Sequence, residues 1–506
     1  MDVEAIVTGA GLIFEPTGLA LIFLGVLIGV TIGALPGLSS TMAVALLLPF
    51  TIGLEPALAI AMMAALYCAG TFGGSITAIL INTPGAPPAV ATALDGYPMA
   101  QRGEAGRALG MAAVASVIGG IFSLIVFIIA APLLAAIALK FRPQEYFALT
   151  LFGLSMLAAI SGRSALRNLI AGAAGVLVST VGIHLVTGVE RFTFGTTWLY
   201  DGIDFVPVLI GLFAIGEMLN QSQSLDVVRE RIRSVAIRLP SRDDFRRCWA
   251  TILRSSGIGT FIGILPAEGT TVAAIMGYNE AKRWSKHKDE FGKGSIEGIA
   301  GPEAANNAGT GGAMVPTLAL GIPGSGTTAV ILAALMIHGL RPGPFLMRET
   351  PEILYAIFTA MLVANFMFLA VGLAGAKLFS MITLIPRTFL WPSVFVFSTV
   401  GAYAYQQTMV DVWVTLIAGF IGFLALRHGF GPAPFVMGLV LGGLVERSWS
   451  QAMIIFDSRW WRFFESPIVN LFFALTVLSL LGPVVAPKLS ALMKRIYPRM
   501  RSPMEE

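Results

Sequence analysis

The residues best suited to chemistry in this chain are small hydroxyls that stand beside helix-breaking Gly and Pro inside long apolar stretches. The run GALPGLSST occupies positions 33–41, and the run GILPAEGTT occupies positions 263–271, an offset of 230. Where a helix is interrupted, its backbone N–H and C=O groups lose their intrahelical partners and can bind an ion or an anionic group instead. The candidate substrate-binding residues at these two breaks are Pro36, Gly37, Ser39, Ser40, Thr41, Gly269, Thr270 and Thr271.

A second pair of glycine-rich runs follows at an offset of 239. GTFGG at 70–74 leads to TPG at 83–85, and GTGG at 309–312 leads to IPG at 322–324. Broken apolar segments at corresponding positions of two halves are the best sequence pointer to the substrate site of a transporter. The run 321–328 resembles a phosphate loop, but no Lys follows its glycines, so nucleotide binding is not expected. The candidates from this pair are Asn82, Thr83, Ser325 and Thr327 for substrate, and Thr310 and Thr328 for a coupling cation.

The densest polar cluster is the run PEAANNAGTGG at 302–312. Asn306 and Asn307 each offer an acceptor for Na⁺ and a donor for a carboxylate, so we expect both to bind substrate. The alternative is an interfacial helix start with Glu303 as its first-turn acid. For any single hydroxyl, the alternative is a helix-packing Ser or Thr that is bonded back to the backbone.

Two carboxylates are candidates for coupling transport to an ion. Ionisable groups inside membrane segments are costly and are functional suspects for that reason. Glu268 lies at the second break, where it could carry a proton or bind a cation, but its counterpart Leu38 is apolar and the tip could simply reach water. Glu303 is the other candidate. We find no Ser/His/Asp arrangement, metal-ligand spacing or HExxH motif, so we expect no enzyme activity, no metal and no cofactor other than Na⁺ or H⁺ as a coupling ion.

The composition indicates where these residues must lie. The 506 residues are 56% hydrophobic and 12% charged, whereas soluble domains carry about 25% charged residues. The net charge of +4 does not indicate nucleic-acid binding, because basic residues gather between the apolar segments, as the positive-inside rule predicts. The chain is therefore predicted to be an all-α polytopic protein of the lipid bilayer, with roughly ten to twelve transmembrane segments of about 20 residues.

Basic stretches predict the topology. Residues 229–254, 282–293 and the C-terminal tail are rich in Lys and Arg, which indicates cytoplasmic faces. If the first two are both cytoplasmic, the apolar stretch between them must enter and leave on one side, as a re-entrant hairpin that turns at Pro266. The offset predicts a matching hairpin over 18–50, with its tip at Pro36 and Gly37. We expect a first repeat half at 1–220, a basic cytoplasmic linker at 221–250, a second half at 251–487 and a cytoplasmic basic tail at 488–506, each half having a re-entrant hairpin and a broken helix.

These motifs resemble the TctA family, the large membrane subunit of the tripartite tricarboxylate transporters. The resemblance rests on GALPG at 33–37, the stretch 67–85, FGKGSIEG at 291–298, PEAANN at 302–307 and PTLALGIPG at 316–324. One departure is the second tip, PAE at 266–268, where the family usually repeats Pro-Gly. The resemblance implies a bacterial inner-membrane system with a small four-helix TctB-like membrane subunit and a TctC-like periplasmic solute-binding protein.

The resemblance also implies that the large subunit translocates a tri- or dicarboxylate with energy from an ion gradient. We interpret the chain as the permease of a secondary transporter importing an organic carboxylate with Na⁺ or H⁺, and an elevator-type motion is expected only by analogy. The alternative is a passive carboxylate or anion channel, or a membrane scaffold subunit without coupling. The residues leave open which carboxylate is carried, which ion is coupled, the N-terminal orientation and the oligomeric state.

Overall fold

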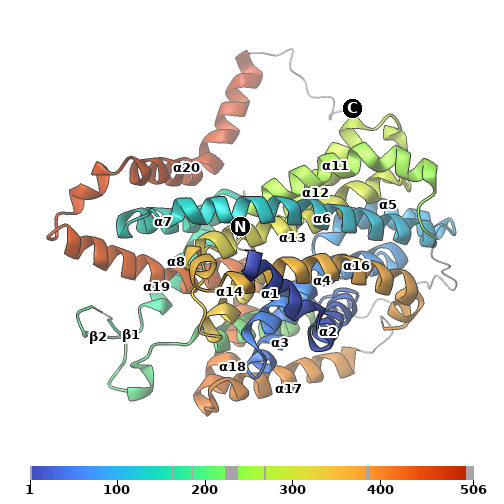
Figure 1. The fold of residues 1–506 in the computed structure, drawn as a ribbon. Helices are drawn as coiled ribbons and strands as arrows, with labels where there is room; N and C mark the ends of the chain where they lie inside the picture. Colours follow the sequence, from blue (N-terminus) through green and yellow to red (C-terminus); the bar gives the residue numbers. More distant parts are fainter. Residues whose placement is uncertain are drawn as a thin grey trace. The chain divides into compact units, whose positions relative to one another are not determined.

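The computed structural model describes residues 3–160, 165–184, 186–222, 238–266, 269–382 and 387–496, and at 157–160, 376–382, 387 and 483–496 it describes the backbone alone. This part of the chain is almost wholly helical (Figure 1). The only strands in these ranges are β1 (Gly182–Ile183) and β2 (Glu190–Arg191), which form a short antiparallel pair. The predicted all-α class is confirmed.

The helices form two compact units. The larger unit comprises Met1–Lys140 and Asp204–Arg427, and the smaller unit comprises Phe141–Ile203 and His428–Glu506. The predicted halves 1–220 and 251–487 therefore each contribute one part to the larger unit and one to the smaller. Residues 223–237 of the predicted linker lie outside the described residues, and a helix already begins at Arg242.

The larger unit holds all of the described candidate site residues. Its helices in chain order are α1 (Val3–Phe14), α2 (Pro16–Gly33), α3 (Ser40–Leu47), η1 (Leu48–Thr51), α4 (Pro56–Ile81), α5 (Ala89–Gln101), α6 (Ala105–Ala138), α9 (Phe205–Ile210), η4 (Gly211–Gly216), α10 (Glu217–Ser222), α11 (Arg242–Ile264), α12 (Gly269–Trp284), η5 (Lys288–Glu290), α13 (Glu297–Leu320), α14 (Gly326–Ile337), α15 (Pro344–Glu349), α16 (Pro351–Ile382), α17 (Arg387–Gln406) and α18 (Met409–Arg427).

The smaller unit carries the remaining elements. They are α7 (Pro143–Ile160), α8 (Ala165–Ser179), the β1–β2 pair, η3 (Thr197–Leu199), α19 (Pro432–Ile455), η6 (Trp460–Glu465) and α20 (Pro467–Ile496). Helix α19 packs on α7 and α8, and α20 packs on α7. The two terminal guanidinium nitrogens of Arg191 donate to the Glu446 carboxylate, which ties the β1–β2 segment to α19.

The helices are interrupted where the sequence predicts breaks. Helix α2 ends at Gly33 and α3 begins at Ser40, and Gly37 between them has φ +90°, a conformation that favours glycine. Helix α11 ends at Ile264 and α12 begins at Gly269; Glu268 lies outside the described residues. Helices α4 and α13 both end in a left-handed residue, Asn82 and Gly321 respectively.

The polar run 302–312 lies inside α13 and does not start a helix. Helix α13 begins at Glu297, so Glu303 stands in its second turn, and its side chain is 0% exposed. The alternative that Glu303 is a first-turn acid of an interfacial helix is therefore wrong. Neither Pro302 nor Pro316 ends the helix, and the break comes only at Gly321.

Six helices among the described residues are long and apolar enough to cross a membrane, namely Pro16–Gly33, Pro56–Ile81, Ala105–Ala138, Phe205–Ser222, Pro351–Gly375 and Met409–Arg427. Shorter apolar helices add Val3–Phe14, Ser40–Thr51, Ala165–Ser179, Gly326–Ile337 and Pro467–Gly482. The most apolar window of α4 is 94% buried, whereas that of α18 is only 28% buried. Helix α4 is therefore surrounded by protein, and α18 has an apolar face free to meet lipid.

The core of the larger unit is built around α4 and α13, whose residues 57–80 and 297–319 are all buried. Helix α13 packs along α6, and α4 packs along α16. Helix α3 packs on α14, and α12 packs on α5. Elements from the two ends of the sequence are thus interleaved, which brings residues more than 200 positions apart into contact.

Glycines allow α2 to approach α4 and α11 to approach α13. A Cβ on Gly33 would clash with the Gly70 carbonyl oxygen, and a Cβ on Gly263 would clash with the Gly309 carbonyl oxygen. Small residues at such crossings let helix backbones pack closely. The same contact recurs at positions related by the two sequence offsets.

Candidate carboxylate and ion site

A polar seam joins α13 to α4. Glu303, Asn306, Asn307 and Thr310 stand at i, i+3, i+4 and i+7 of α13, so they share one helix face. Their side chains are at most 1% exposed. The α4 side of the seam presents the carbonyl oxygens of Cys68 and Thr71 and the sulfur of Cys68. The structure thus brings together the polar residues that the sequence singled out in the run 302–312.

The two asparagines bind the backbone of α4 through their amino groups. Asn306 Nδ2 donates to the Thr71 carbonyl oxygen at 3.4 Å, and Asn307 Nδ2 donates to the Cys68 carbonyl oxygen at 3.2 Å. The Oδ1 atoms of both are buried and have no hydrogen-bond partner among the described residues. A buried acceptor without a donor is uncommon in proteins. These two oxygens are therefore available to a cation or to a donor on a ligand.

Thr310 extends the seam by one turn. Its hydroxyl donates to the Asn307 carbonyl oxygen at 2.7 Å and lies 3.8 Å from the Cys68 sulfur. The alternative of a helix-packing hydroxyl bonded to the backbone thus describes the present contacts of Thr310.

Glu303 is enclosed by hydroxyl groups. Thr92 of α5 donates to Glu303 Oε1 at 2.5 Å, and Ser116 of α6 donates to Oε2 at 2.9 Å. Ser75 of α4 is a third hydroxyl beside the carboxyl. The carboxyl is fully buried, and no Lys or Arg of the described chain forms an ion pair with it. Helices α4, α5, α6 and α13 all meet at this one group.

The starts of two helices meet at a hydroxyl-lined junction. Thr41 Oγ1 of α3 lies 2.7 Å from Thr327 Oγ1 of α14, and the Tyr67 hydroxyl lies 3.3 Å from Ser325 Oγ. Ser39 caps α3 by accepting from the Met42 N–H at 3.2 Å. The first-turn N–H groups of two helices carry partial positive charge, and together they suit an anionic ligand.

The capping box of α14 supplies further hydroxyls at the junction. Ser325 Oγ accepts from the Thr328 N–H at 3.2 Å, and Thr328 Oγ1 accepts from the Ser325 N–H at 2.9 Å. Ser40 also lies at this place, with its hydroxyl against Gly70. Pro36 and Gly37 are half-buried in the loop that leads into the junction.

The second break lacks an equivalent hydroxyl junction. Helix α12 starts at Gly269, and Thr270 packs against Gly309 much as Ser40 packs against Gly70. At the start of its neighbour α5, Ala86, Pro88 and Ala89 occupy the positions that correspond to Ser325, Thr327 and Thr328, and α5 itself begins at Ala89. The two junctions therefore differ in chemistry.

Other candidates lie apart from the α3–α14 junction. Asn82 is exposed at the end of α4, and the Thr83 hydroxyl donates to the Ile81 carbonyl oxygen at 3.2 Å. No hydrogen bond of the described residues joins Asn82, Thr83, Thr270 or Thr271 to the junction.

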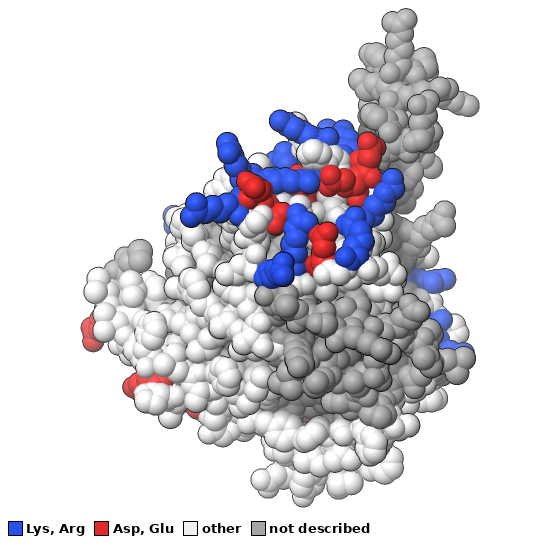
Figure 2. All heavy atoms as spheres, turned by 90° about the vertical axis from the view of Figure 1, so that its right-hand side faces the viewer, with Lys and Arg blue, Asp and Glu red and all other residues white. Residues whose placement is uncertain are grey.

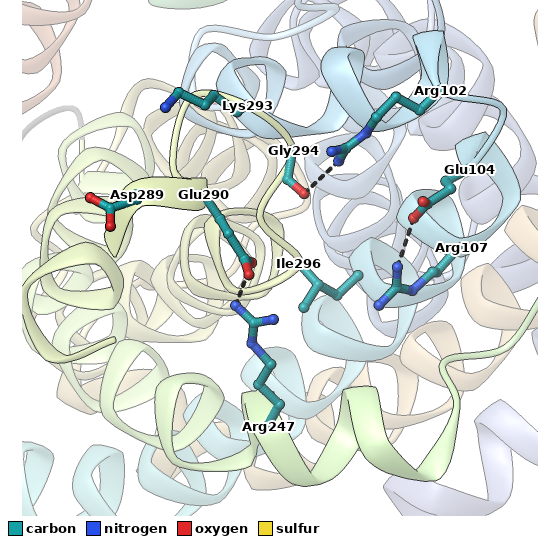
Figure 3. Close-up of a pocket in the computed structure, with 9 residues that line it drawn as sticks. All are labelled: Arg102, Glu104, Arg107, Arg247, Asp289, Glu290, Lys293, Gly294 and Ile296. Carbon is teal, nitrogen blue, oxygen red and sulfur yellow. Dashed lines mark hydrogen bonds and ion pairs between the residues drawn. The ribbon is translucent and has the colours of Figure 1, made fainter. Parts of the chain in front are cut away.

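A charged cavity lies elsewhere in the larger unit. Figure 2 shows Lys and Arg gathered with Asp and Glu in one band on the face that it draws. The cavity holds about 390 Å³ and is lined by Arg102, Glu104, Arg107, Arg247, Asp289, Glu290, Lys293, Gly294 and Ile296 (Figure 3).

The guanidinium groups of this cavity are already occupied. Arg107 pairs with Glu104 and Asp244, and Arg247 pairs with Glu290 and Glu297. Arg102 donates to the Gly294 carbonyl oxygen at 2.9 Å. Because most of its charges are compensated, this cavity is a poor site for a carboxylate substrate.

Asp95 of α5 is a buried carboxylate that the sequence analysis missed. Its Oδ1 accepts the backbone N–H groups of Gly292, Gly294 and Ser295, each at 2.8 Å. Its Oδ2 accepts the Tyr278 hydroxyl at 2.9 Å. The FGKGS run is thus a backbone nest around one carboxylate, which fixes the α12–α13 loop to α5. A charged residue inside an otherwise apolar stretch was the signal that could have found Asp95.

Tyr67, Thr92 and Ser116 were also missed. They are single polar residues on buried helix faces, and only the packing of α4, α5 and α6 on α13 and α14 gives them partners. No group of three or more His, Cys, Asp or Glu side chains in the described ranges could hold a metal ion.

Comparison with known proteins identifies the family of this chain. Residues 19–437 match the model of the tripartite tricarboxylate transporter TctA family. An Agrobacterium vitis protein described as "Uncharacterized 52.8 kDa protein in TAR-I ttuC' 3'region" is 38% identical over 453 residues, covering 90% of each chain. A second, "Uncharacterized protein in TAR-II ttuC' 3'region" from the same organism, is 36% identical over 197 residues, or 39% of this chain and 81% of its own. No solved structure matches this chain.

Proposed function

Because this chain belongs to the tripartite tricarboxylate transporter TctA family, we propose that it is the permease subunit that imports an organic carboxylate with energy from a Na⁺ or H⁺ gradient. Family membership makes it a membrane component of tripartite tricarboxylate transport and not an enzyme.

The observation that carries the proposal is the junction of α3 and α14. One carboxylate group of the substrate binds there, between the two helix starts, and takes hydrogen bonds from the Thr41, Ser325 and Thr327 hydroxyls. The 2.7 Å contact of Thr41 with Thr327 supports this, because a ligand oxygen placed there would meet both hydroxyls at once. The second junction at Gly269, Thr270 and Thr271 binds a less polar part of the substrate, since it lacks the paired hydroxyls.

The coupling ion binds on the seam close to the substrate. The unpartnered oxygens of Asn306 and Asn307, together with Thr310 and Thr328, are hard donors that suit Na⁺, and Glu303 suits either Na⁺ or H⁺. Glu268 is a further candidate at the second tip, outside the described residues.

The chain consists of two repeat halves, each with a re-entrant hairpin. Several pairs of contacts support this, since α6 on α13 mirrors α16 on α4, and α3 on α14 mirrors α12 on α5. The Gly33–Gly70 and Gly263–Gly309 contacts support it at the level of single residues. With paired hairpins around one site, an elevator-type motion moves the hairpins and broken helices against a fixed scaffold.

The proposed setting is the bacterial inner membrane. The basic linker at 221–250 and the tail at 488–506 face the cytoplasm. The partners are a small TctB-like membrane subunit and a TctC-like periplasmic solute-binding protein, as the family implies in general.

The test is uptake by the complete three-part system in proteoliposomes. Labelled citrate, malate and succinate are supplied with Na⁺ and pH gradients imposed separately. Accumulation of one acid under one gradient is expected. Equilibration without accumulation under either gradient would favour a passive channel, and no passage of any acid would overturn carboxylate transport itself.

A further inference from the structure

We propose that the coupling ion is H⁺ and that Glu303 is the residue that carries it. This inference rests on the proposed function, because it names the ion of the same transport reaction. It starts from a contrast between two buried carboxyl groups, Glu303 on α13 and Asp95 on α5. Both side chains are 0% exposed, and Asp95 lies one helical turn from Thr92, the partner of Glu303.

Asp95 is surrounded by groups that act as donors. Three backbone N–H groups point at its Oδ1, and a backbone N–H can never accept a hydrogen bond. A proton on Oδ1 would break this arrangement. Oδ1 of Asp95 is therefore held by three fixed donors, and only its Oδ2, beside the Tyr278 hydroxyl, has a partner that can reverse its role.

Glu303 is surrounded by hydroxyls, which can donate or accept. With the carboxylate ionised, Thr92 and Ser116 donate to Oε1 and Oε2. With the carboxyl protonated, one hydroxyl can turn and accept its O–H. Both protonation states can thus be fully hydrogen-bonded without moving a helix, which is what a group that loads and unloads a proton requires.

Ser75 is a third hydroxyl at the Glu303 carboxyl. At present it donates to the Phe72 carbonyl oxygen at 2.7 Å. In this position Ser75 Oγ can accept from a protonated Glu303, and once the hydroxyl turns it can donate to an ionised one.

The oxygens at Glu303 are spaced as hydrogen-bond partners. Thr92 Oγ1 and Glu303 Oε1 are 2.5 Å apart, the distance of a strong hydrogen bond. Burying an unpaired carboxylate is also costly, while burying the neutral acid is much less so.

No other charged group in the described chain touches this carboxyl. On α6, no charged residue stands between Arg107 and Lys140. The titratable groups on the elements packed against α13 are Tyr67 and Cys68 of α4, Asp95 and Tyr97 of α5, Arg107 of α6, Arg242, Asp243, Asp244, Arg246, Arg247, Cys248 and Arg254 of α11, Tyr278, Glu280, Lys282 and Arg283 of α12, Arg348 and Glu349 of α15, and Glu297 of α13 itself.

Glu303 is also placed to communicate with the substrate junction. Asn306 and Asn307 follow it on the same face of α13 and bind the α4 backbone at Thr71 and Cys68. The next α4 residue, Tyr67, contacts Ser325 at the start of α14. A change in the charge of Glu303 therefore reaches the α3–α14 junction through one continuous polar seam.

The test is transport by the complete system, with the parent compared with Glu303→Gln. The parent is expected to accumulate labelled citrate, malate or succinate under an inward pH gradient with Na⁺ absent. Glu303→Gln imitates the protonated acid. Under the pH gradient it should therefore accumulate at least 10-fold less substrate than the parent. It should still exchange external for internal substrate when the two concentrations are equal.

Three outcomes would overturn the proton assignment while leaving carboxylate transport standing. They are accumulation by the parent under a Na⁺ gradient alone, unchanged pH-driven accumulation by Glu303→Gln, and loss of equilibrium exchange as well as accumulation in a folded Glu303→Gln protein. Transport of no acid by the parent would instead contradict the proposed function.

A spectroscopic measurement covers the case in which Glu303→Gln does not insert. Infrared difference spectra of the purified subunit across a pH titration should contain the C=O stretch of a buried carboxylic acid. Ser116→Ala should shift this band, because it removes one hydrogen bond to the carboxyl. Glu297→Gln, a buried acid of the same helix that is paired with Arg247, should leave it unchanged. Absence of the band at every pH would overturn the assignment.

Discussion

The side-chain amide of Asn307 donates to the backbone carbonyl oxygen of Cys68, and these two positions are separated by the repeat offset of 239. The two central helices therefore meet at equivalent points of their sequences. On either side of this contact, Cys68 meets Thr310 and Asn306 meets Thr71. A contact between equivalent residues is expected on the axis of a two-fold relation, which supports the proposed repeat halves, and the proposed ion and substrate site lies around this contact.

Asn306 and Asn307 should be essential for uptake and dispensable for insertion. Asn306→Ala and Asn307→Ala each remove a buried oxygen that has no partner in the described chain, and we expect uptake to fall at least 10-fold. Membrane insertion, followed by the amount of protein in purified membranes, should stay near that of the parent. Asn365→Ala is the control, because Asn365 of α16 is as buried and its Oδ1 likewise has no partner among the described residues, but its amide donates to Met361 of its own helix and not to α4. Unchanged uptake in both seam variants would contradict the assignment of Asn306 and Asn307 to the site.

The Thr41–Thr327 contact should set substrate affinity. Thr41→Val and Thr327→Val keep the side-chain shape and remove one hydroxyl each, so each should raise the substrate concentration for half-maximal uptake about 10-fold, the loss of one hydrogen bond of about 1.4 kcal/mol to a charged group. Because both hydroxyls serve one ligand group, the double variant should lose less binding free energy than the two single variants lose together. Thr359→Val on α16 is the matched control. Strictly additive effects would argue against a shared ligand oxygen.

Two glycines of α11 should respond in opposite ways to the same substitution. Gly263→Ala places a methyl group against the Gly309 carbonyl oxygen and should lower the melting temperature and the yield of folded protein. Gly257→Ala, on the same helix, meets nothing within 4 Å and should be neutral or stabilising by up to about 1 kcal/mol. Gly33→Ala should behave like Gly263→Ala. Thermal unfolding in detergent measures all three, and equal tolerance at 257 and 263 would contradict the close α11–α13 approach.

Asp95 should be a structural anchor. Asp95→Asn removes the charged acceptor of three N–H groups, and we expect a loss of about 3 kcal/mol in the free energy of unfolding together with faster amide exchange at 292–295. Tyr278→Phe removes only one donor and should cost about 1 kcal/mol. Hydrogen-exchange mass spectrometry on the α12–α13 loop is the measurement. Slow exchange at 292–295 in Asp95→Asn would show that the nest does not depend on the carboxylate.

The ion pair of Asp244 gives a stability that depends on pH. Hydrogen bonds from the Arg107 guanidinium hold the pKa of the Asp244 carboxyl below its ordinary value. The pKa of Asp244 is lower in the folded protein than in the unfolded chain. The stabilisation is therefore fully present above the ordinary Asp pKa of about 3.9, and it is lost as the pH falls through the lower pKa of the folded state.

Asp244→Asn should therefore melt below the parent at neutral pH, and the gap in melting temperature should close as the pH is lowered past about 4. The neighbouring Asp243 is exposed, so Asp243→Asn should leave the melting temperature unchanged at every pH. Thermal unfolding in detergent at a series of pH values is the measurement. A gap that persists at low pH would mean that Asp244 stabilises the protein through packing and not through its charge.

The sequence by itself determined the membrane class, the helical fold, the places where helices stop and the family. Apolar stretches with few charges can form only helices in a bilayer, because every backbone polar group must be satisfied internally. Gly and Pro act on their own backbone, so the breaks after Gly33, Ile264 and Leu320 follow from local conformation. The amides of the run 302–312 stood out because polar residues are rare in such helices.

Only the tertiary structure decided which of these breaks meet. Thr41 and Thr327 are 286 positions apart, and Glu303 and Thr92 are 211 apart, so no local pattern pairs them. The sequence analysis treated both hairpin tips as one set, whereas packing gives the α3–α14 junction its hydroxyls and leaves Asn82 exposed. It also missed Asp95, whose role depends on a loop nearly 200 positions away. The reason is physical: local dihedral preferences fix where a helix ends, but side-chain partners are chosen by how whole helices pack, which depends on every contact between them at once.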